Sequence, residues 1–167
     1  DAYLARGQLI WTLSNKFPHE RAVQEVRRAL ELNPNLQEAH FQIGSIYLHI
    51  GLLDKALEAL KTSVSLDPND KAGPPRIARV HWFQGKYEQA LAEFEQVQGW
   101  ESERATLLCY LGMKDEALAL LEKASKGGAD FHGEARVAGA YALVLATLGR
   151  AKEAEQKIKF AIESDQR

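Results

Sequence analysis

The chain has 167 residues, of which 46% are hydrophobic and 26% are charged. Its 21 Lys and Arg nearly balance its 23 Asp and Glu, which leaves a net charge of −2. This composition is globular, and it argues against nucleic-acid binding because contacts to phosphate require a surplus of positive charge. No apolar run approaches the roughly 18 residues that a transmembrane helix needs. We therefore expect neither a nucleic-acid partner nor a membrane span.

The cysteine content and the first residue bear on the context of the chain. Cys109 is the single cysteine, so an intrachain disulfide is excluded and a cytoplasmic location is favoured. The sequence begins at Asp1 rather than at a methionine, and we expect the chain to be a fragment of a longer polypeptide.

The first predicted element is a pair of helices within residues 3–36. Asn33-Pro34 is expected to end the second helix, because a proline disfavours helix at the residue before it. The turn between the helices contains Phe17-Pro18, where later turns have a glycine. We expect Asn15 or His19 to cap a helix end in this turn.

Residues 37–70 carry the clearest pattern. Ala56, Leu60 and Val64 recur at four-residue spacing, which is the period of an amphipathic helix. Gly51 is expected to end the preceding helix, because glycine adopts the left-handed conformation without a side-chain penalty. Asp67-Pro68 ends the second helix. The segment therefore predicts a helical hairpin.

Residues 71–97 repeat this hairpin with changes at both ends. Ala90 follows Ala56 by 34 residues (90 − 56), and Ala56 follows Ala22 by the same step (56 − 22). Gly73-Pro74-Pro75 is expected to shorten the first helix and to place proline in its opening turn. The second helix is expected to end near Gln98-Gly99.

Two further hairpins, at residues 98–130 and 131–167, continue the series with irregular steps. Ala117 follows Ala90 by 27 residues (117 − 90), and Ala154 follows Ala117 by 37 residues (154 − 117). Gly112 and Gly149 stand five residues before these two alanines, as Gly51 does before Ala56. The hairpin pattern therefore persists to the end of the chain.

The longer second step points to a loop and a long helix. Gly127-Gly128 predicts the loop. Asp130 is expected to cap a helix that runs to about Leu148, because a carboxylate accepts hydrogen bonds from the free N–H groups of a first turn.

The repeated unit resembles the tetratricopeptide repeat family, which has a pattern of Leu-Gly, Tyr, Ala, Phe, Ala and Pro over about 34 residues. In residues 37–70 the pattern is carried by Ile43-Gly44, Tyr47, Ala56, Leu60 and Pro68. The resemblance implies an all-α fold, a right-handed superhelical solenoid of about ten antiparallel helices. The five repeats are expected at approximately 3–36, 37–70, 71–97, 98–130 and 131–167.

No constellation of side chains for chemistry is evident in the sequence. The five histidines lack the His-Glu-x-x-His spacing and no paired cysteines occur, so we predict no metal site and no cofactor. Cys109 has no base beside it in the sequence, and we assign no catalytic residue. The protein is therefore expected not to be an enzyme.

The family resemblance implies a partner-binding concave face, lined by the first helix of each hairpin. Carrying the family's contact positions onto this chain gives a set of candidate residues for binding a protein or peptide. They are Gln8, Trp11, Phe41, Gln42, Ser45, His49, Arg76, Arg79, Trp82, Phe83, Thr106, Tyr110 and Arg136. Trp11 is the strongest candidate, because the family usually has a small or polar residue there. The alternative is that about half of these large residues pack in the core or between repeats.

Two arginines suggest the chemistry of the partner. Arg76 and Arg79 are three residues apart and share one helical face, so we hypothesise a preference for acidic segments. The Lys and Asn with which some family members clamp a chaperone tail are absent, which argues against that ligand. The alternative function is self-association, with the ends of the array pairing copies into a homo-oligomer.

Overall fold

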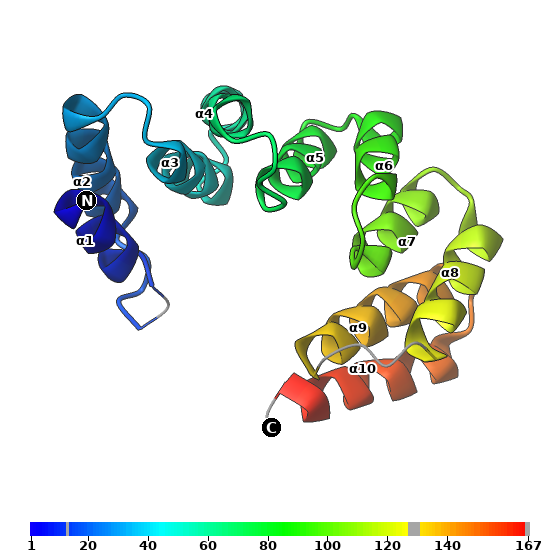
Figure 1. Ribbon diagram of the computed structural model, residues 1–167. Coiled ribbons are helices and arrows are strands. Elements are labelled where there is room, and N and C mark those ends of the chain that lie inside the picture. The colour runs from blue at the N-terminus through cyan, green and yellow to red at the C-terminus, as the bar shows by residue number, and fades with distance from the viewer. Residues whose placement is uncertain (13, 127–130, 166–167) are drawn as a thin grey trace. The chain divides into compact units, whose positions relative to one another are not determined.

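The computed structural model describes residues 1–12, 14–126 and 131–165. Within these ranges the chain is all-helical, with ten helices and no strand (Figure 1). It divides into two compact units, residues 1–85 and 86–167, and each is described by itself. The first unit contains α1 (Ala2–Ile10), α2 (His19–Leu32), α3 (Gln37–His49), α4 (Leu53–Leu66) and α5 (Gly73–Phe83). The second contains α6 (Tyr87–Glu95), α7 (Glu101–Tyr110), α8 (Lys114–Lys126), α9 (Phe131–Thr147) and α10 (Ala151–Asp165).

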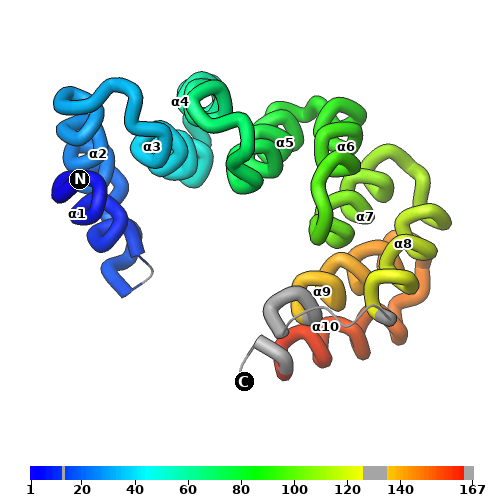
Figure 2. The backbone as a smooth tube through the Cα atoms, viewed as in Figure 1, coloured from blue at the N-terminus to red at the C-terminus, as the bar shows by residue number. Residues whose placement is uncertain are grey.

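Helices that are consecutive in the chain pack against each other within each unit. In the first unit α1 pairs with α2 and α3 pairs with α4, while α5 contacts both α3 and α4. In the second unit α7 pairs with α8, and α9 lies beside α10 (Figure 2). These pairs confirm the predicted all-α arrangement of helical hairpins.

Three of the turns between helices close in the same way, through the backbone. At the end of α3, the Gly51 N–H donates to Leu48 O (3.2 Å) and the Leu52 N–H donates to Tyr47 O (2.9 Å). The same pair of bonds follows α7 and α9, at Gly112 and Gly149. All three glycines have φ between 76° and 82°, which is the left-handed conformation that this closure requires. The prediction that glycine ends the first helix of a hairpin is confirmed.

The turn between α1 and α2 is built differently. The Asn15 side chain donates to Leu9 O (2.9 Å) and so satisfies a carbonyl at the end of α1, which confirms Asn15 as a cap. His19 does not cap: it is the first residue of α2, which follows Pro18 without a side-chain cap. Lys16 (φ 57°) and Phe17 (φ 48°) both adopt the left-handed conformation, in which non-glycine residues are strained.

The remaining boundaries agree with the sequence in part. Proline lies in the opening turn of α5, as predicted. The helix α6 ends at Glu95, earlier than the predicted end near Gln98-Gly99, and Gly99 has φ 82° in the following turn. The predicted loop at Gly127-Gly128 and the predicted cap Asp130 lie outside the described residues. No helix in the described part of the chain is both long and apolar enough to cross a bilayer.

One apolar position recurs in every hairpin, four residues after the recurrent alanine of the second helix. It holds Val26, Leu60, Phe94 and Leu121, and each of these side chains is fully buried. The fifth member, Ile158 on α10, is 49% exposed. Each of the first four lies on a helix that also contacts the next helix along the chain. The helix α10, by contrast, makes its main contacts in the described residues with α9 alone. The outer face of α10 therefore has apolar side chains that no other described helix covers.

Candidate functional site

The predicted site residues fall into two groups, because the chain divides into two units. Three residues belong to the second unit: Thr106 and Tyr110 on α7, and Arg136 on α9. The other ten lie on or directly after the first helices α1, α3 and α5 of the first unit. They are Gln8, Trp11, Phe41, Gln42, Ser45, His49, Arg76, Arg79, Trp82 and Phe83.

The helices α1 and α3 are joined at their partly exposed faces. Gln8 donates from Nε2 to Glu38 Oε1 across a distance of 3.0 Å. Phe41 is half-buried and packs against the core of the unit, and Gln42 beside it is also half-buried. Ser45 is buried, and its hydroxyl has no hydrogen-bond partner among the described residues. This face thus offers polar side chains next to a partly covered aromatic ring.

Trp11 lies at the centre of a cluster of four rings, which we call the aromatic cluster. Its ring centroid is 5.4 Å from that of Phe17 and 5.6 Å from that of His49, and both pairs meet edge to face. His19 completes the cluster, with its ring 4.9 Å from His49. The cluster joins the end of α1, the strained turn, the start of α2 and the end of α3.

The aromatic cluster contains two unsatisfied donors or acceptors. Trp11 Nε1 and His19 Nε2 are buried and have no hydrogen-bond partner within the described part of the chain. Burial lowers the pKa of His19, and the nearby His49 lowers it further. Buried polar atoms without partners are rare in native proteins, so these two atoms are an unusual feature of the aromatic cluster.

Sequence reasoning found only half of the aromatic cluster. It selected Trp11 and His49, and it missed Phe17 and His19 as members of the site. The one available signal was the departure from the glycine rule at Phe17-Pro18, which marked this turn as unusual.

The helix α5 carries two arginines and two aromatic residues. Arg76 and Arg79 are both half-buried. Burial lowers the pKa of Arg76, and the neighbouring charge of Arg79 lowers it further. Arg76 forms no ion pair with any residue that the structure describes. Trp82 and Phe83 are in ring contact at 6.0 Å, and Phe83 is 56% exposed.

The three candidates of the second unit are held by local contacts. Thr106 donates its hydroxyl to Ser102 O (2.7 Å). Tyr110 stacks on Tyr87, with 5.3 Å between the ring centroids. The guanidinium of Arg136 lies 5.6 Å from the ring centroid of Trp100, which itself packs against Phe94. Trp100 thus contacts side chains of both α6 and α9.

The described residues contain no group of three or more His, Cys, Asp or Glu that could hold a metal ion. Cys109 Sγ lies 3.2 Å from the hydroxyl of Thr147, which is not a base. The arrangement offers aromatic, amide and guanidinium groups, which are the usual groups of protein interfaces.

Comparison with known proteins shows which fold and which repeat this chain resembles. The structure is similar to TTC0263, a thermophilic protein of Thermus thermophilus, with a TM-score of 0.78 and 24% identity over 99% of this chain and 91% of that chain. A family model described as "Tetratricopeptide repeat" matches residues 37–70 and 76–104. Residues 37–70 and 76–104 therefore match the tetratricopeptide repeat family, and the described chain shares the fold of the tetratricopeptide repeat proteins that it resembles.

Two further proteins resemble this chain. The structure is similar to YrrB, a tetratricopeptide repeat protein with an unusual peptide-binding site, with a TM-score of 0.64 and 17% identity over 97% of this chain and 84% of that chain. Mouse protein O-mannosyl-transferase TMTC1 is 31% identical over 81 residues, which are 46% of this chain and 9% of that protein. The chain therefore spans only a small part of that relative. Tetratricopeptide repeats are generally non-catalytic scaffolds for proteins or peptides.

Proposed function

We propose that the chain is a non-enzymatic scaffold that binds a protein or peptide segment along the first helices α1, α3 and α5. The segment would run past the aromatic cluster and the arginines of α5. Thr106, Tyr110 and Arg136 are the contact residues that we propose for the second unit. The alternation of aromatic rings, amides and guanidinium groups supports this role, because such side chains supply most of the energy at protein interfaces.

The observation that carries the proposal is the state of Arg76. Its guanidinium is half-buried, is repelled by Arg79 and forms no ion pair with a described residue. A charge that is partly removed from water without a partner is costly, and a carboxylate of a bound segment would remove that cost. We therefore propose an acidic peptide segment as the ligand.

The test uses a peptide selected on the native chain from a random displayed library. We expect Arg76→Ala to weaken its binding by about 1.5–3 kcal/mol, which is the usual range for a hydrogen bond to a charged group. Arg28→Ala is the matched control, since Arg28 is exposed on α2 and has an i,i+3 contact with Glu31. Affinities measured by calorimetry that do not change in Arg76→Ala and Arg79→Ala would refute the acidic preference.

Self-association is the second candidate function, and the exposed face of α10 favours it. Ile158 and Ile162 are four residues apart on one helical face, and they are 49% and 54% exposed. Pairing of this face with its copy would bury both side chains. Light scattering over a range of concentrations is the test: a dimer that Ile158→Glu dissociates supports the idea, and a monomer at all concentrations excludes it.

A further inference from the structure

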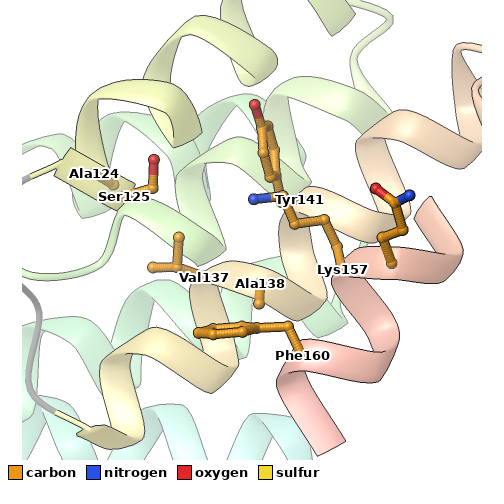
Figure 3. A pocket seen from close by; sticks show the side chains of 8 residues that line it. Ala124, Ser125, Val137, Ala138, Tyr141, Lys157 and Phe160 are labelled. Carbon is orange, nitrogen blue, oxygen red and sulfur yellow. The ribbon is translucent and has the colours of Figure 1, made fainter. Parts of the chain in front are cut away.

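A groove of about 460 Å³ lies in the second unit between α8, α9 and α10 (Figure 3). Val137, Ala138 and Phe160 form its apolar part, and the side chains of Tyr141 and Lys157 stand beside them. None of the thirteen candidate residues on or directly after α1, α3, α5, α7 and α9 lines it. It is therefore a separate feature from the site proposed above.

A position beside the groove holds a small residue here and a larger residue in an earlier hairpin. Ala138 precedes Ala154 by sixteen residues (154 − 138), as His40 precedes Ala56 (56 − 40). In that hairpin the ring of His40 folds back, with its Nε2 2.8 Å from Pro34 O. Ala138 has only a methyl group, and the exposed ring of Phe160 remains partly uncovered beside it.

The groove has a positive charge at its edge. Lys157 Nζ lies 4.5 Å from the centroid of the Tyr141 ring, which is a cation–π contact. Of the neighbouring carboxylates, Glu122 lies near Tyr141 and raises the pKa of its hydroxyl, and Glu153 binds Arg150 through two contacts of 2.7 Å. Lys157 forms no ion pair with the residues that the structure describes.

We propose that this groove is a second peptide site, which takes an aromatic side chain adjacent to an acidic residue. The aromatic ring would pack on Phe160 and Val137 above Ala138, in an offset arrangement that rings prefer. The acidic group would meet Lys157. A cavity of about 150 Å³ holds one benzene ring, so this groove has room for the ring and for the peptide backbone on either side.

Depletion of a peptide library separates binding at this groove from binding along α1, α3 and α5. A displayed library of random linear peptides is first depleted on the Ala138→Phe variant, whose added ring would fill the groove, and the remainder is selected on the native chain. We expect enrichment of peptides with Phe, Tyr or Trp next to Asp or Glu. The strongest peptide is then synthesised and measured by calorimetry.

Two further variants decide the role of the charge. Lys157→Gln is expected to weaken binding of the synthetic peptide by about tenfold, as expected for loss of one charge-assisted contact. Lys152→Gln, on an exposed position of α10 outside the groove, should leave it unchanged, and so should Arg76→Ala. Circular dichroism establishes that each variant is folded.

The outcomes are distinct from those of the proposed function. Enrichment without an aromatic–acidic pair, no enrichment after depletion, or equal binding by Lys157→Gln and the native chain would each overturn the groove proposal. Binding of phenylacetate to the native chain but not to Ala138→Phe, with no peptide enriched, would assign the groove to small molecules and would also overturn the proposal. Peptides whose binding is lost in Arg76→Ala but not in Lys157→Gln support only the site proposed along α1, α3 and α5.

Discussion

At the scale of single residues, the contact between α3 and α4 depends on the absence of a side chain at Gly44. A Cβ at this position would lie 2.7 Å from Leu60 Cγ and 3.2 Å from the Leu60 backbone nitrogen. Leu60 is fully buried, so it has little freedom to move. The Leu-Gly element of the repeat is thus a packing requirement between the two helices of the hairpin.

We predict that Gly44→Ala lowers the free energy of unfolding by about 1–3 kcal/mol through overpacking. Gly139→Ala is the matched comparison, because Gly139 lies inside α9 with no atom within 4 Å of an added Cβ. There alanine should raise the free energy of unfolding by about 0.5–1 kcal/mol. Urea unfolding curves measure both, and equal effects of the two substitutions would contradict the packing argument.

The lowered pKa of His19 predicts a dependence of stability on pH. In the unfolded chain a histidine titrates near 6.5, whereas burial and His49 place the folded pKa of His19 below that value. As pH falls below about 6.5, the unfolded state takes up the proton first, so stability declines until the folded pKa is passed. Above this range His19 is neutral in both states and contributes no pH dependence.

His19→Gln should therefore flatten the loss of stability on acidification. The free energy of unfolding is measured in urea between about pH 7.5 and about pH 5, and the slope of the variant is compared with that of the native chain. The free energy of unfolding of the variant near pH 7.5 gives separately the stability that is lost through altered packing. Identical slopes would show that His19 does not carry this pH dependence.

At the scale of elements, the turn between α1 and α2 stores backbone strain. Lys16 and Phe17 are consecutive non-glycine residues in the left-handed conformation. Each such residue costs on the order of 1–3 kcal/mol. Phe17 is retained there by its contacts with Trp11 and His49, whereas Lys16 is exposed and has no ring to pack.

Lys16→Gly is accordingly predicted to stabilise the protein by about 1 kcal/mol, because relief of strain exceeds the greater chain entropy of glycine. Lys16→Ala removes the same side chain but keeps the strain, so it serves as the control and should change stability little. The thermal midpoints of the two variants give the comparison. A lower midpoint for Lys16→Gly than for Lys16→Ala would contradict the prediction.

The elements differ in how far the sequence predicts them. The hairpins could be predicted because Gly51, Gly112 and Gly149 each end a first helix by a local rule. The turn at Phe17 could not, because its conformation depends on contacts with α3, about thirty residues away in the chain. For the same reason the aromatic cluster was found only at Trp11 and His49. The groove beside Ala138 was not foreseen, since no sequence motif marks its lining residues.

At the scale of the whole molecule, the two compact units predict local rather than global effects of core substitutions. In repeat proteins each hairpin contacts mainly its neighbours, and stability is a sum of local terms. Leu121 is fully buried in the core of the second unit, together with Val144 and Ala117. Its truncation should therefore weaken that unit first.

Leu121→Ala is predicted to cost about 2–5 kcal/mol, as for other buried leucines. Amide hydrogen exchange should accelerate more in α7–α9 than in α2–α4. Leu143→Ala, at a 42% exposed position of α9, is the control and should change both regions little. Equal acceleration throughout the chain would indicate a single cooperative unit instead.

The backbone closure after α3, α7 and α9 has a consequence for the divergence of relatives over evolution. Its hydrogen bonds join main-chain atoms, and the residues after the three glycines are as different as Leu52, Met113 and Arg150. Apart from the glycine, mutation can therefore replace the side chains of these turns without opening the hairpins. Such freedom is consistent with the similar fold of TTC0263 over 99% of this chain at 24% sequence identity.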